Sequence, residues 1–483
     1  MYDLIIIGAG PAGIALAHCC SNIKLKILVI DSNDSIGGCH RVTRVNEYFT
    51  EHGPRIYSSA YLNFKMLLEE MGENFDKLFT PYDFQFTTIG NKTILSTLNL
   101  AELYVLFSDL VKLMLNDDYG KNITIKDHIN YNNFTFQSAD IMDKICRLTD
   151  GADSSKYTLN EFLQIVNQQL FYKIYQPREP NDIGLFKTWK NFLESKNVEF
   201  KLSTHVKTIH QTNNVATHIT AIDRNGETVK FYGKTIIIAA PPEHIINILK
   251  NSDTVIKNAF GNFTALQSYS TKTKYINYIQ ATFHWNTKIK LGKVYGFPSS
   301  NWGIAFVVLS DYMKFNQNNS QTVVSAAITI TDKVSDFTNK TANQSNKSEI
   351  LQEMFRILNM SFGNNLPKPH IVIFNPHTKY KNNSWISEDT AFISSPNAES
   401  FDFKSKTIGN LYNVGTHNDK HLYRFTTLES AITNSIFLSH ELFPELATVY
   451  PIKKLLTVKT IVQLFVMICV CTILIKLFYG CQL

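Results

Sequence analysis

Cysteine is scarce in this chain, and the few cysteines do not have a metal-binding spacing. Seven occur among 483 residues, and no two form a Cys-x-x-Cys pair. Such a chain is not held together by a disulfide framework, and the spacing indicates no zinc site. Runs of basic residues interleaved with aromatic residues are also missing, and the net charge of +6 is spread out. We therefore expect no metal site and no nucleic-acid partner.

Long apolar runs are also rare, apart from one near the C-terminus. Residues 455–479 are almost wholly apolar, with lysines only near the two ends. At about 1.5 Å per residue, such a helix crosses a hydrocarbon core of about 30 Å. Lys453 and Lys454 precede it, and the positive-inside tendency then leaves the body in the cytosol. The N-terminus has no room for a secretory signal peptide. Together with the apolar run, this predicts a single-pass, tail-anchored membrane protein. The alternative is that the C-terminal helix is buried in the protein.

The clearest motif lies in the first thirty-one residues. An apolar strand at 4–7 leads into Gly8-Ala9-Gly10-Pro11-Ala12-Gly13, and a second apolar strand at 27–30 ends in Asp31. In a β-α-β unit, the first glycine makes the turn, the second lets a pyrophosphate approach the backbone, and the third lets the helix pack on the strand. The helix N-terminus attracts phosphates, and the acid suits a ribose diol. We expect a dinucleotide site here; a purely structural glycine turn is the alternative.

A pair of adjacent glycines follows Asp31. Gly37 and Gly38 come shortly after Asp31, and Arg41 lies just beyond them. The pair offers a second close approach to the backbone, and the arginine offers a counter-charge for a pyrophosphate. With the first motif, this segment resembles the flavin-binding signature of the superfamily of flavin amine oxidases, protoporphyrinogen oxidases, carotenoid desaturases and UDP-galactopyranose mutases. The resemblance implies that the dinucleotide is FAD.

One position departs from the pattern of that superfamily. An arginine usually follows the glycine pair directly, whereas Cys39 and His40 intervene here before Arg41. Arg41 is therefore interpreted either as a phosphate ligand or as a surface arginine. The following segment, Gly53-Pro54-Arg55-Ile56-Tyr57, is similar to the galactopyranose mutases, and we place Gly53 and Pro54 at the cofactor.

Two later segments resemble the parts of the superfamily that return to the flavin. In the strand 205–209, Val206 stands where the superfamily has a valine beside the adenine; an ordinary sheet strand is the alternative. We expect this strand to pair with one at 198–202. Near the C-terminus, a strand ending in Gly415 precedes a helix that begins around Glu429 and Ala431. In the superfamily, the N-terminus of this helix points at the flavin pyrimidine and stabilises negative charge on the reduced ring.

The resemblance implies an α/β fold. We expect a Rossmann-like FAD-binding domain with an interleaved α+β substrate domain and a C-terminal transmembrane helix. The FAD-binding parts are 1–80, 181–250 and 395–447, with a helical substrate-side segment at 81–180, a substrate domain of sheet and helices at 251–394, and the transmembrane run at 455–479. Further helices are predicted at 61–71, 98–115, 159–172 and 349–360, and further strands at 234–239, 275–283, 303–309, 323–330 and 370–374.

Catalytic residues are harder to identify. A flavin accepts a hydride without a protein acid or base when the substrate is held against it, so the lack of a catalytic triad leaves an oxidase open. Amine oxidases of the superfamily often place a lysine near the flavin, and Lys274 stands near that position, one residue out of register. Thr427 stands where a substrate-caging tyrosine is expected. No cysteine lies between Cys146 and Cys469, so the resemblance implies non-covalent FAD.

Three functional hypotheses follow. The first is a membrane-anchored FAD-dependent oxidoreductase that oxidises a C–N or C–H bond of a small molecule by hydride transfer, with oxygen as the electron acceptor. The second is a flavin-dependent mutase or isomerase of the UDP-galactopyranose mutase type. The third is a flavin-binding membrane protein without catalysis, which the displaced Arg41 and the absent cage tyrosine permit.

Overall fold

A computed structural model describes residues 1–480 apart from short gaps, and all structural statements concern the described residues. The gaps are residues 54, 83–84, 88–96, 151–152, 273–274, 277, 292–293, 297–299, 316–318, 389–390, 393–401 and 419–426. Two predicted site residues, Pro54 and Lys274, therefore lie outside the described residues.

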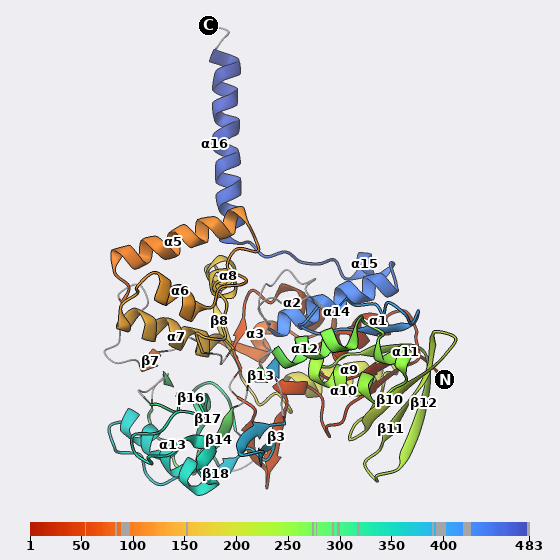
Figure 1. Ribbon diagram of the computed structural model, residues 1–483, viewed down its shortest axis with the longest axis horizontal. Coiled ribbons are helices and arrows are strands. Elements are labelled where there is room, and N and C mark those ends of the chain that lie inside the picture. Colours follow the sequence, from red (N-terminus) through yellow and green to blue (C-terminus); the bar gives the residue numbers. More distant parts are fainter. Residues whose placement is uncertain are drawn as a thin grey trace.

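The N-terminal motif builds a parallel sheet. β1 (Tyr2–Ile7) lies between β2 (Ile27–Ile30) and the last part of β12 (Thr228–Ile238), while β9 (Glu199–Lys201) pairs with β2 and β22 (Leu411–Asn413) pairs with β12. All four pairings are parallel. Residues 4–7 of β1 form a continuous apolar run because both faces of the sheet are covered there. Strands from the beginning, middle and end of the chain thus meet in one layer (Figure 1).

Helices cover both faces of this sheet. Leu4 and Ile6 belong to a core shared with α1 (Pro11–Ser21), α2 (Leu62–Glu70), α9 (Leu185–Ser195) and α14 (Leu428–Leu442). Ile5 and Ile7 point the other way, into a core shared with α10 (Pro242–Lys250) and α12 (Phe263–Lys272). This alternation follows from the two-residue period of a strand.

An antiparallel ribbon extends the sheet, and here one sequence prediction is wrong. β10 (His205–Thr212) pairs with β11 (Val215–Ile222), which pairs with the first part of β12. The segment 198–202 does not pair with 205–209, because its strand β9 joins β2 instead. The reason lies in the connection: Ser203 N–H donates to the Asn33 carbonyl at 2.7 Å, and Thr204 N–H donates to the Asp31 carbonyl at 2.8 Å. The connection is thereby held at the end of β2.

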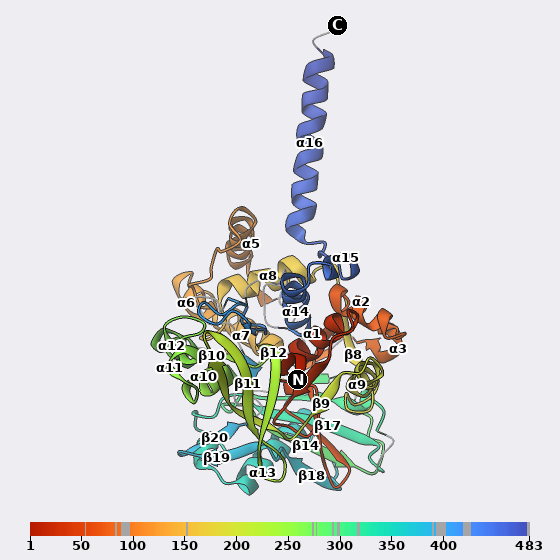
Figure 2. The same ribbon diagram turned by 90° about the vertical axis from the view of Figure 1, so that its right-hand side faces the viewer.

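A second sheet lies on the opposite side of the body (Figures 1 and 2). Its strand order is β18 (Ile371–Phe374), β14 (Ile279–Trp285), β17 (Thr322–Ile328), β16 (Ile304–Val308), β15 (Val294–Gly296) and β7 (Gln85–Thr87). α13 (Lys347–Ser361) packs on one face of this sheet. The predicted strand 275–283 proves to be two strands, because β13 (Tyr275–Ile276) pairs with β21 (Ala391–Phe392) outside this sheet.

Four helices form a separate layer between residues 100 and 169. They are α5 (Leu100–Leu115), α6 (Ile125–Tyr131), α7 (Phe136–Asp150) and α8 (Leu159–Gln169), and α6 and α7 were not predicted. Capping boxes begin α5 at Asn99 with Glu102 and α8 at Thr158 with Glu161. The remaining elements are β3 (Val42–Val45), β4 (Tyr48–Glu51), β5 (Tyr57–Ser58), α3 (Phe75–Leu78), β6 (Phe79–Pro81), β8 (Ile174–Pro177), α11 (Thr254–Lys257), β19 (Thr378–Lys381), β20 (Ser384–Ser387) and α15 (Leu446–Val449).

The C-terminal helix α16 (Val458–Gly480) projects away from the body (Figures 1 and 2). It is long and apolar enough to cross a membrane, and none of its 458–475 stretch is buried against the protein. The alternative of a buried C-terminal helix is therefore wrong.

Glu161, in the capping box of α8, makes folding sensitive to pH. Its Oε2 accepts hydrogen bonds from Thr158 N–H at 3.1 Å and Thr158 Oγ1 at 2.8 Å, and burial raises the pKa of Glu161 from 4.5 to about 7. The stability that comes from the uncharged acid is therefore present below about pH 4.5 and is lost as the pH rises through 7. We expect the wild type to lose about 1–3 kcal/mol of unfolding free energy from this residue between pH 5 and pH 8.

The variant Glu161→Gln keeps the acceptor oxygen but has no charge to bury. Urea unfolding at pH 5 and pH 8 measures the free energy of unfolding of both proteins. Between these two pH values, we expect the free energy of unfolding of Glu161→Gln to fall by about 1–3 kcal/mol less than that of the wild type. Glu227→Gln, at an exposed position, serves as the control and should behave as the wild type. Equal pH dependence in E161Q and the wild type would contradict this assignment.

Candidate functional site

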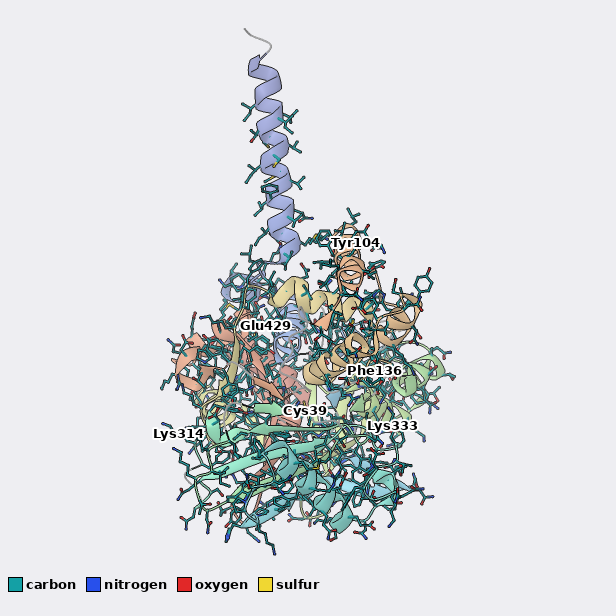
Figure 3. All side chains as sticks on the ribbon, turned by 90° about the vertical axis from the view of Figure 1, so that its left-hand side faces the viewer. Cys39, Tyr104, Phe136, Lys314, Lys333 and Glu429 are labelled. Carbon is teal, nitrogen blue, oxygen red and sulfur yellow. The ribbon has the colours of Figure 1, made fainter. Side chains whose placement is uncertain are left out.

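A cavity of about 400 Å³ lies at the carboxyl ends of β1 and β2 and reaches the six-stranded sheet. In α/β sheets, ligands bind outside the carboxyl ends of the strands. Cys39, from the loop after β2, lies near the centre of the body (Figure 3) and is part of the cavity wall. The wall also includes these predicted site residues: Gly8, Gly10, Pro11, Ala12, Asp31, Gly38, Arg41, Val206, Gly415 and Ala431.

Glycines are required in the first loop because of its close contacts. Gly8 has φ +118°, and a Cβ there would lie 2.2 Å from the Ala239 carbonyl oxygen. A Cβ on Gly13 would lie 1.9 Å from the Gly8 carbonyl oxygen, so this residue sets the packing of α1 on β1 without lining the cavity. Gly37 donates its N–H to the Ala9 carbonyl at 2.8 Å. This bond joins the two glycine loops, so that both reach the cavity.

Gly10 and Gly38 form the narrowest contact between the two loops. A Cβ on Gly38 would lie 3.0 Å from the Gly10 Cα, and both residues line the cavity beside the N-terminus of α1. The backbone of both glycine loops and the N-terminus of α1 therefore face the cavity. This arrangement favours the binding of an anionic group such as a diphosphate.

Asp31 fixes the first glycine loop while it lines the cavity. Its Oδ2 accepts the Ala9 N–H at 2.7 Å, and its Oδ1 accepts the Asn33 N–H at 2.8 Å. Oδ1 also accepts the Asn33 side-chain amide at 2.9 Å, whereas Oδ2 has a further lone pair with which Asp31 can accept a ligand hydroxyl.

The wall next to Asp31 comes from β10 and α10. Thr204, His205, Val206 and Lys207 line it, and the β10–β11 register shifts between Val206 and Thr208. His244, Asn247 and Ile248 of α10 and Asn251 just after it also line the wall, and sequence reasoning did not identify them. The available signal was the Pro241-Pro242 pair after a buried strand, which marks a helix start beside the first motif.

The N-terminus of α14 forms another part of the wall. Thr427, Leu428 and Ala431 line the cavity. Thr427 is the N-cap, because its Oγ1 accepts the Ser430 N–H at 3.1 Å and Ser430 Oγ accepts the Thr427 N–H at 2.8 Å. The threonine that stands where a cage tyrosine was expected therefore begins the helix.

His417 is a wall residue that the sequence did not point to. It is buried against Gly415, where a Cβ would lie 2.6 Å from its ring, and its Nε2 lies 2.9 Å from Asn413 Oδ1. Burial lowers the pKa of His417 to about 3. The imidazole is therefore neutral near pH 7 and donates from Nε2 to the amide oxygen.

Glu429 does not line the cavity, although the sequence suggested that it binds the cofactor. Its Oε1 accepts the Asn63 N–H at 2.8 Å, and its Oε2 accepts the Phe64 N–H at 2.9 Å. These are free N–H groups in the first turn of α2, whose N-cap residue Tyr61 makes no side-chain cap. Glu429 therefore caps α2 and joins it to α14.

Replacing Glu429 by alanine should destabilise the protein, because two buried N–H groups lose their acceptor. We expect a loss of about 2–3 kcal/mol of unfolding free energy in Glu429→Ala. Chemical denaturation measures this change, and Glu441→Ala, at an exposed position of the same helix, is the matched control. A loss no greater than that of the control would show that α2 does not depend on this cap.

Two other predicted residues lie near the cavity but outside its wall. Gly37, at φ +114°, would bring a Cβ within 2.6 Å of the Phe186 ring. Gly53 faces the Tyr278 ring, at 3.4 Å for a Cβ, and Tyr278 itself lines the wall. A side chain on Gly37 would overlap the Phe186 ring, whereas one on Gly53 would only touch the Tyr278 ring.

The part of the cavity nearest the six-stranded sheet is rich in arginine. Arg41 is only 6% exposed and lines the wall, so the alternative of a surface arginine is wrong. Arg55 and Arg147 line it as well. Arg147 forms an ion pair with Asp143, while its buried Nε has no hydrogen-bond partner among the described residues. The cavity wall also includes Ala305 of β16, Ala327 of β17, Tyr61, Tyr278, Thr329 and Glu388.

Buried acid–base groups surround the loop that carries Arg55. Burial raises the pKa of Glu51 to about 8 against the opposing effect of Arg55. Burial and Arg55 lower the pKa of His40, which lines the cavity, and that of His52. Both imidazoles and the carboxyl are therefore largely uncharged at neutral pH. No group of three or more potential metal ligands occurs among the described residues.

Comparison with known proteins agrees with this arrangement. Residues 6–71 match the family model of the NAD(P)-binding Rossmann-like domain. Dihydrolipoyl dehydrogenase from Mycoplasma genitalium is 36% identical over 91 residues, which is 16% of this chain and 20% of that protein. The chain thus matches about a fifth of that relative's length.

The whole body resembles solved amine oxidases. A putrescine oxidase bound to putrescine superposes with a TM-score of 0.64 at 12% identity, covering 92% of this chain and 99% of that one. Cyclohexylamine oxidase from Brevibacterium oxydans gives a TM-score of 0.60 at 14% identity, covering 91% and 99%. The chain therefore combines a Rossmann-like segment with the overall fold of solved amine oxidases.

Proposed function

We propose that the cavity binds FAD non-covalently and that the protein is an oxidoreductase that oxidises a C–N or C–H bond of a small molecule. The supporting observation is that the two glycine loops, Asp31, Val206 and the N-terminus of α14 line one continuous cavity. Bound FAD supplies a two-electron acceptor for a hydride, and oxygen is the proposed final acceptor.

Each part of the wall fits one part of FAD. Gly10 and Gly38, with the N-terminus of α1, fit the diphosphate, and Asp31 fits a ribose diol. Val206 and its neighbours on β10 fit the adenine. The N-terminus of α14 at Thr427 supplies a positive end for the pyrimidine. The arginine-rich part near the six-stranded sheet is then left for the substrate.

The protein's own residues position and shield the substrate in this proposal. Ala305, Ala327 and Thr329 supply a mostly apolar floor, and Tyr61 and Tyr278 supply aromatic walls. These surfaces exclude water and hold the substrate beside the flavin, so hydride transfer requires no further catalytic group. The role of Lys274 stays a prediction, because it lies outside the described residues.

Absorbance spectroscopy of the purified protein tests this proposal. A flavin spectrum that bleaches anaerobically with an amine, followed by release of hydrogen peroxide when air is admitted, supports an oxidase. A protein that stays colourless after incubation with FAD contradicts the proposal. A bound flavin that no substrate or reductant bleaches indicates a flavin-binding protein without catalysis.

A mutase acting on a nucleotide sugar is the second candidate. Arg55 and Arg147 favour it, because guanidinium groups in the substrate part of the cavity suit an anionic substrate such as a nucleoside diphosphate. Turnover of a nucleotide sugar that requires prior reduction of the flavin distinguishes this candidate from the oxidase.

The membrane attachment of this enzyme is the second part of the proposal. We propose that α16 crosses a membrane and leaves the body on the cytosolic side, where Lys453 and Lys454 lie. Deleting residues 458–483 should move the protein from the membrane fraction, resistant to alkaline carbonate, to the soluble fraction without loss of flavin. Retention of the shortened protein in carbonate-washed membranes would show that α16 is not the main anchor.

A further inference from the structure

The helix α5 presents its apolar face to the outside. Its exposed large side chains recur every three or four residues, and at about 100° per residue they fall within an arc of about 80° on one face. They are Leu100, Tyr104, Phe107, Val111 and Leu115, with exposed fractions of 86%, 71%, 65%, 39% and 85%. These five residues are called the α5 stripe below. A helix that packs on a soluble domain faces such a stripe inward.

The opposite face of α5 carries buried acids. Glu102 is 4% exposed, and its carboxylate accepts the Thr135 N–H at 2.6 Å and the Ser138 hydroxyl at 2.7 Å. Asp109 is 2% exposed and accepts the Tyr119 hydroxyl at 2.6 Å. These bonds fix the rotation of the helix, because turning it over would leave buried polar groups without partners. The outward direction of the α5 stripe is therefore built into the fold.

α5 lies beside the base of α16 and across its direction (Figures 1 and 2). Lys459, near the start of α16, pairs with Asp117 just after α5 at 2.8 Å, and its N–H donates to Asn167 Oδ1 of α8 at 3.0 Å. Figure 3 shows Tyr104 of the α5 stripe at the end of the body from which α16 projects. A membrane crossed by α16 thus meets α5 at its surface.

Neighbouring segments continue the apolar surface around the base of α16. Leu170 and Phe171 follow α8 and are 63% and 48% exposed, and Leu456 is 47% exposed. The Leu456 N–H donates to the Tyr172 hydroxyl at 3.0 Å, which places these residues together. Exposed apolar side chains gathered in this way mark an interaction surface.

We propose that α5 lies flat in the headgroup region of the bilayer that α16 crosses, with the α5 stripe directed toward the acyl chains. This inference rests on the proposed membrane attachment by α16. A helix with one apolar face that includes a tyrosine suits the interface of a bilayer. Lys453 and Lys454, exposed beside the same surface, add attraction for anionic lipid. A lipid surface is favoured over a protein partner because the apolar patch is continuous with the base of the spanning helix.

Quenching of tryptophan fluorescence by brominated lipid tests this proposal in the full-length protein. Phe107→Trp places a probe in the α5 stripe, and Tyr380→Trp places a matched probe at an exposed site on β19, at the end of the body away from α16 (Figure 2). Both proteins are incorporated into vesicles of phosphatidylcholine and phosphatidylserine in a 4:1 ratio, with bromines near the top of the acyl chains. Leu115→Trp gives a second probe in the stripe should Phe107→Trp fold poorly.

With brominated lipid, we expect the fluorescence that the tryptophan at position 107 adds to the wild-type spectrum to fall by at least half. The fluorescence added by the tryptophan at position 380 should fall by less than a tenth. Equal, weak quenching at both positions in protein that floats with the vesicles overturns the α5 proposal but leaves the α16 anchor intact. Weak quenching at 107 with a blue shift that grows with protein concentration assigns the stripe to a second copy of the chain, which also overturns it. Protein that does not float with the vesicles overturns both proposals.

Discussion

If the cavity binds FAD as proposed, Asp31→Ala should purify without flavin. The substitution removes the acceptor for a ribose diol and also the acceptor for the Ala9 N–H, which holds the first glycine loop. Hydrogen bonds to a charged group contribute about 1.5–3 kcal/mol each, so losing two of them weakens FAD binding by about 100-fold or more. The ratio of absorbance at the flavin band to that at 280 nm measures the effect.

Asp34→Ala is the matched control for this variant. Asp34 is three residues further along, is exposed, and accepts a hydrogen bond from the Ser35 hydroxyl at 3.0 Å. We expect it to keep the full flavin content. Should Asp31→Ala also keep its flavin, with an unchanged melting temperature, Asp31 would have no part in cofactor binding.

Gly13→Ala should prevent stable folding of the N-terminal unit. The added Cβ would lie 1.9 Å from the Gly8 carbonyl oxygen and 3.2 Å from the Ala239 side chain, so α1 cannot pack on β1 without moving. Overpacking of this kind costs about 1–3 kcal/mol and more where backbone blocks relaxation, as it does here. We expect the protein to accumulate mainly in the insoluble fraction and any soluble part to unfold at a much lower temperature.

Two other glycines provide the comparison. Gly409→Ala should have little effect, because nothing lies within 4 Å of its Cβ position. In Gly10→Ala the new Cβ meets only the Gly38 Cα, at an ordinary 3.7 Å, so the fold should persist while the cavity narrows where the diphosphate is proposed. A Gly13→Ala protein as stable as Gly409→Ala would mean that the helix–strand contact is not tight.

The sequence predicted the first motif well because its constraints are local. Gly13 packs against Gly8 within one β-α-β unit, and its spacing implied this contact. The contact of Gly8 with Ala239 and the hydrogen bond from the Ala9 N–H to Asp31 were not predicted. Arg41 is a case in which the sequence was not sufficient. Its charge suggested a phosphate ligand or a surface residue, and only the packing of distant segments shows that it is buried.

Long-range contacts account for most of what the sequence did not reveal. Ser203 and Thr204 look like an ordinary hairpin turn, yet they are hydrogen-bonded to the end of β2. Glu429 has the composition of a helix start beside a ligand, yet it caps another helix. Asn247 and Asn251 reach the cavity only because α10 runs past the glycine loops. For α5, the sequence predicted a helix at 98–115 but not which of its faces points outward.

The pairing of β1 with β12 has a consequence for how the protein is made. Tyr2 lies opposite Gly233, so β1 has no partner on that side until β12, 231 positions further along the chain, has been synthesised. Until then, an apolar strand edge is open to other chains. Non-local parallel pairing also slows folding. The nascent protein should therefore depend on chaperones during synthesis, and expression at low temperature should raise the yield of soluble material.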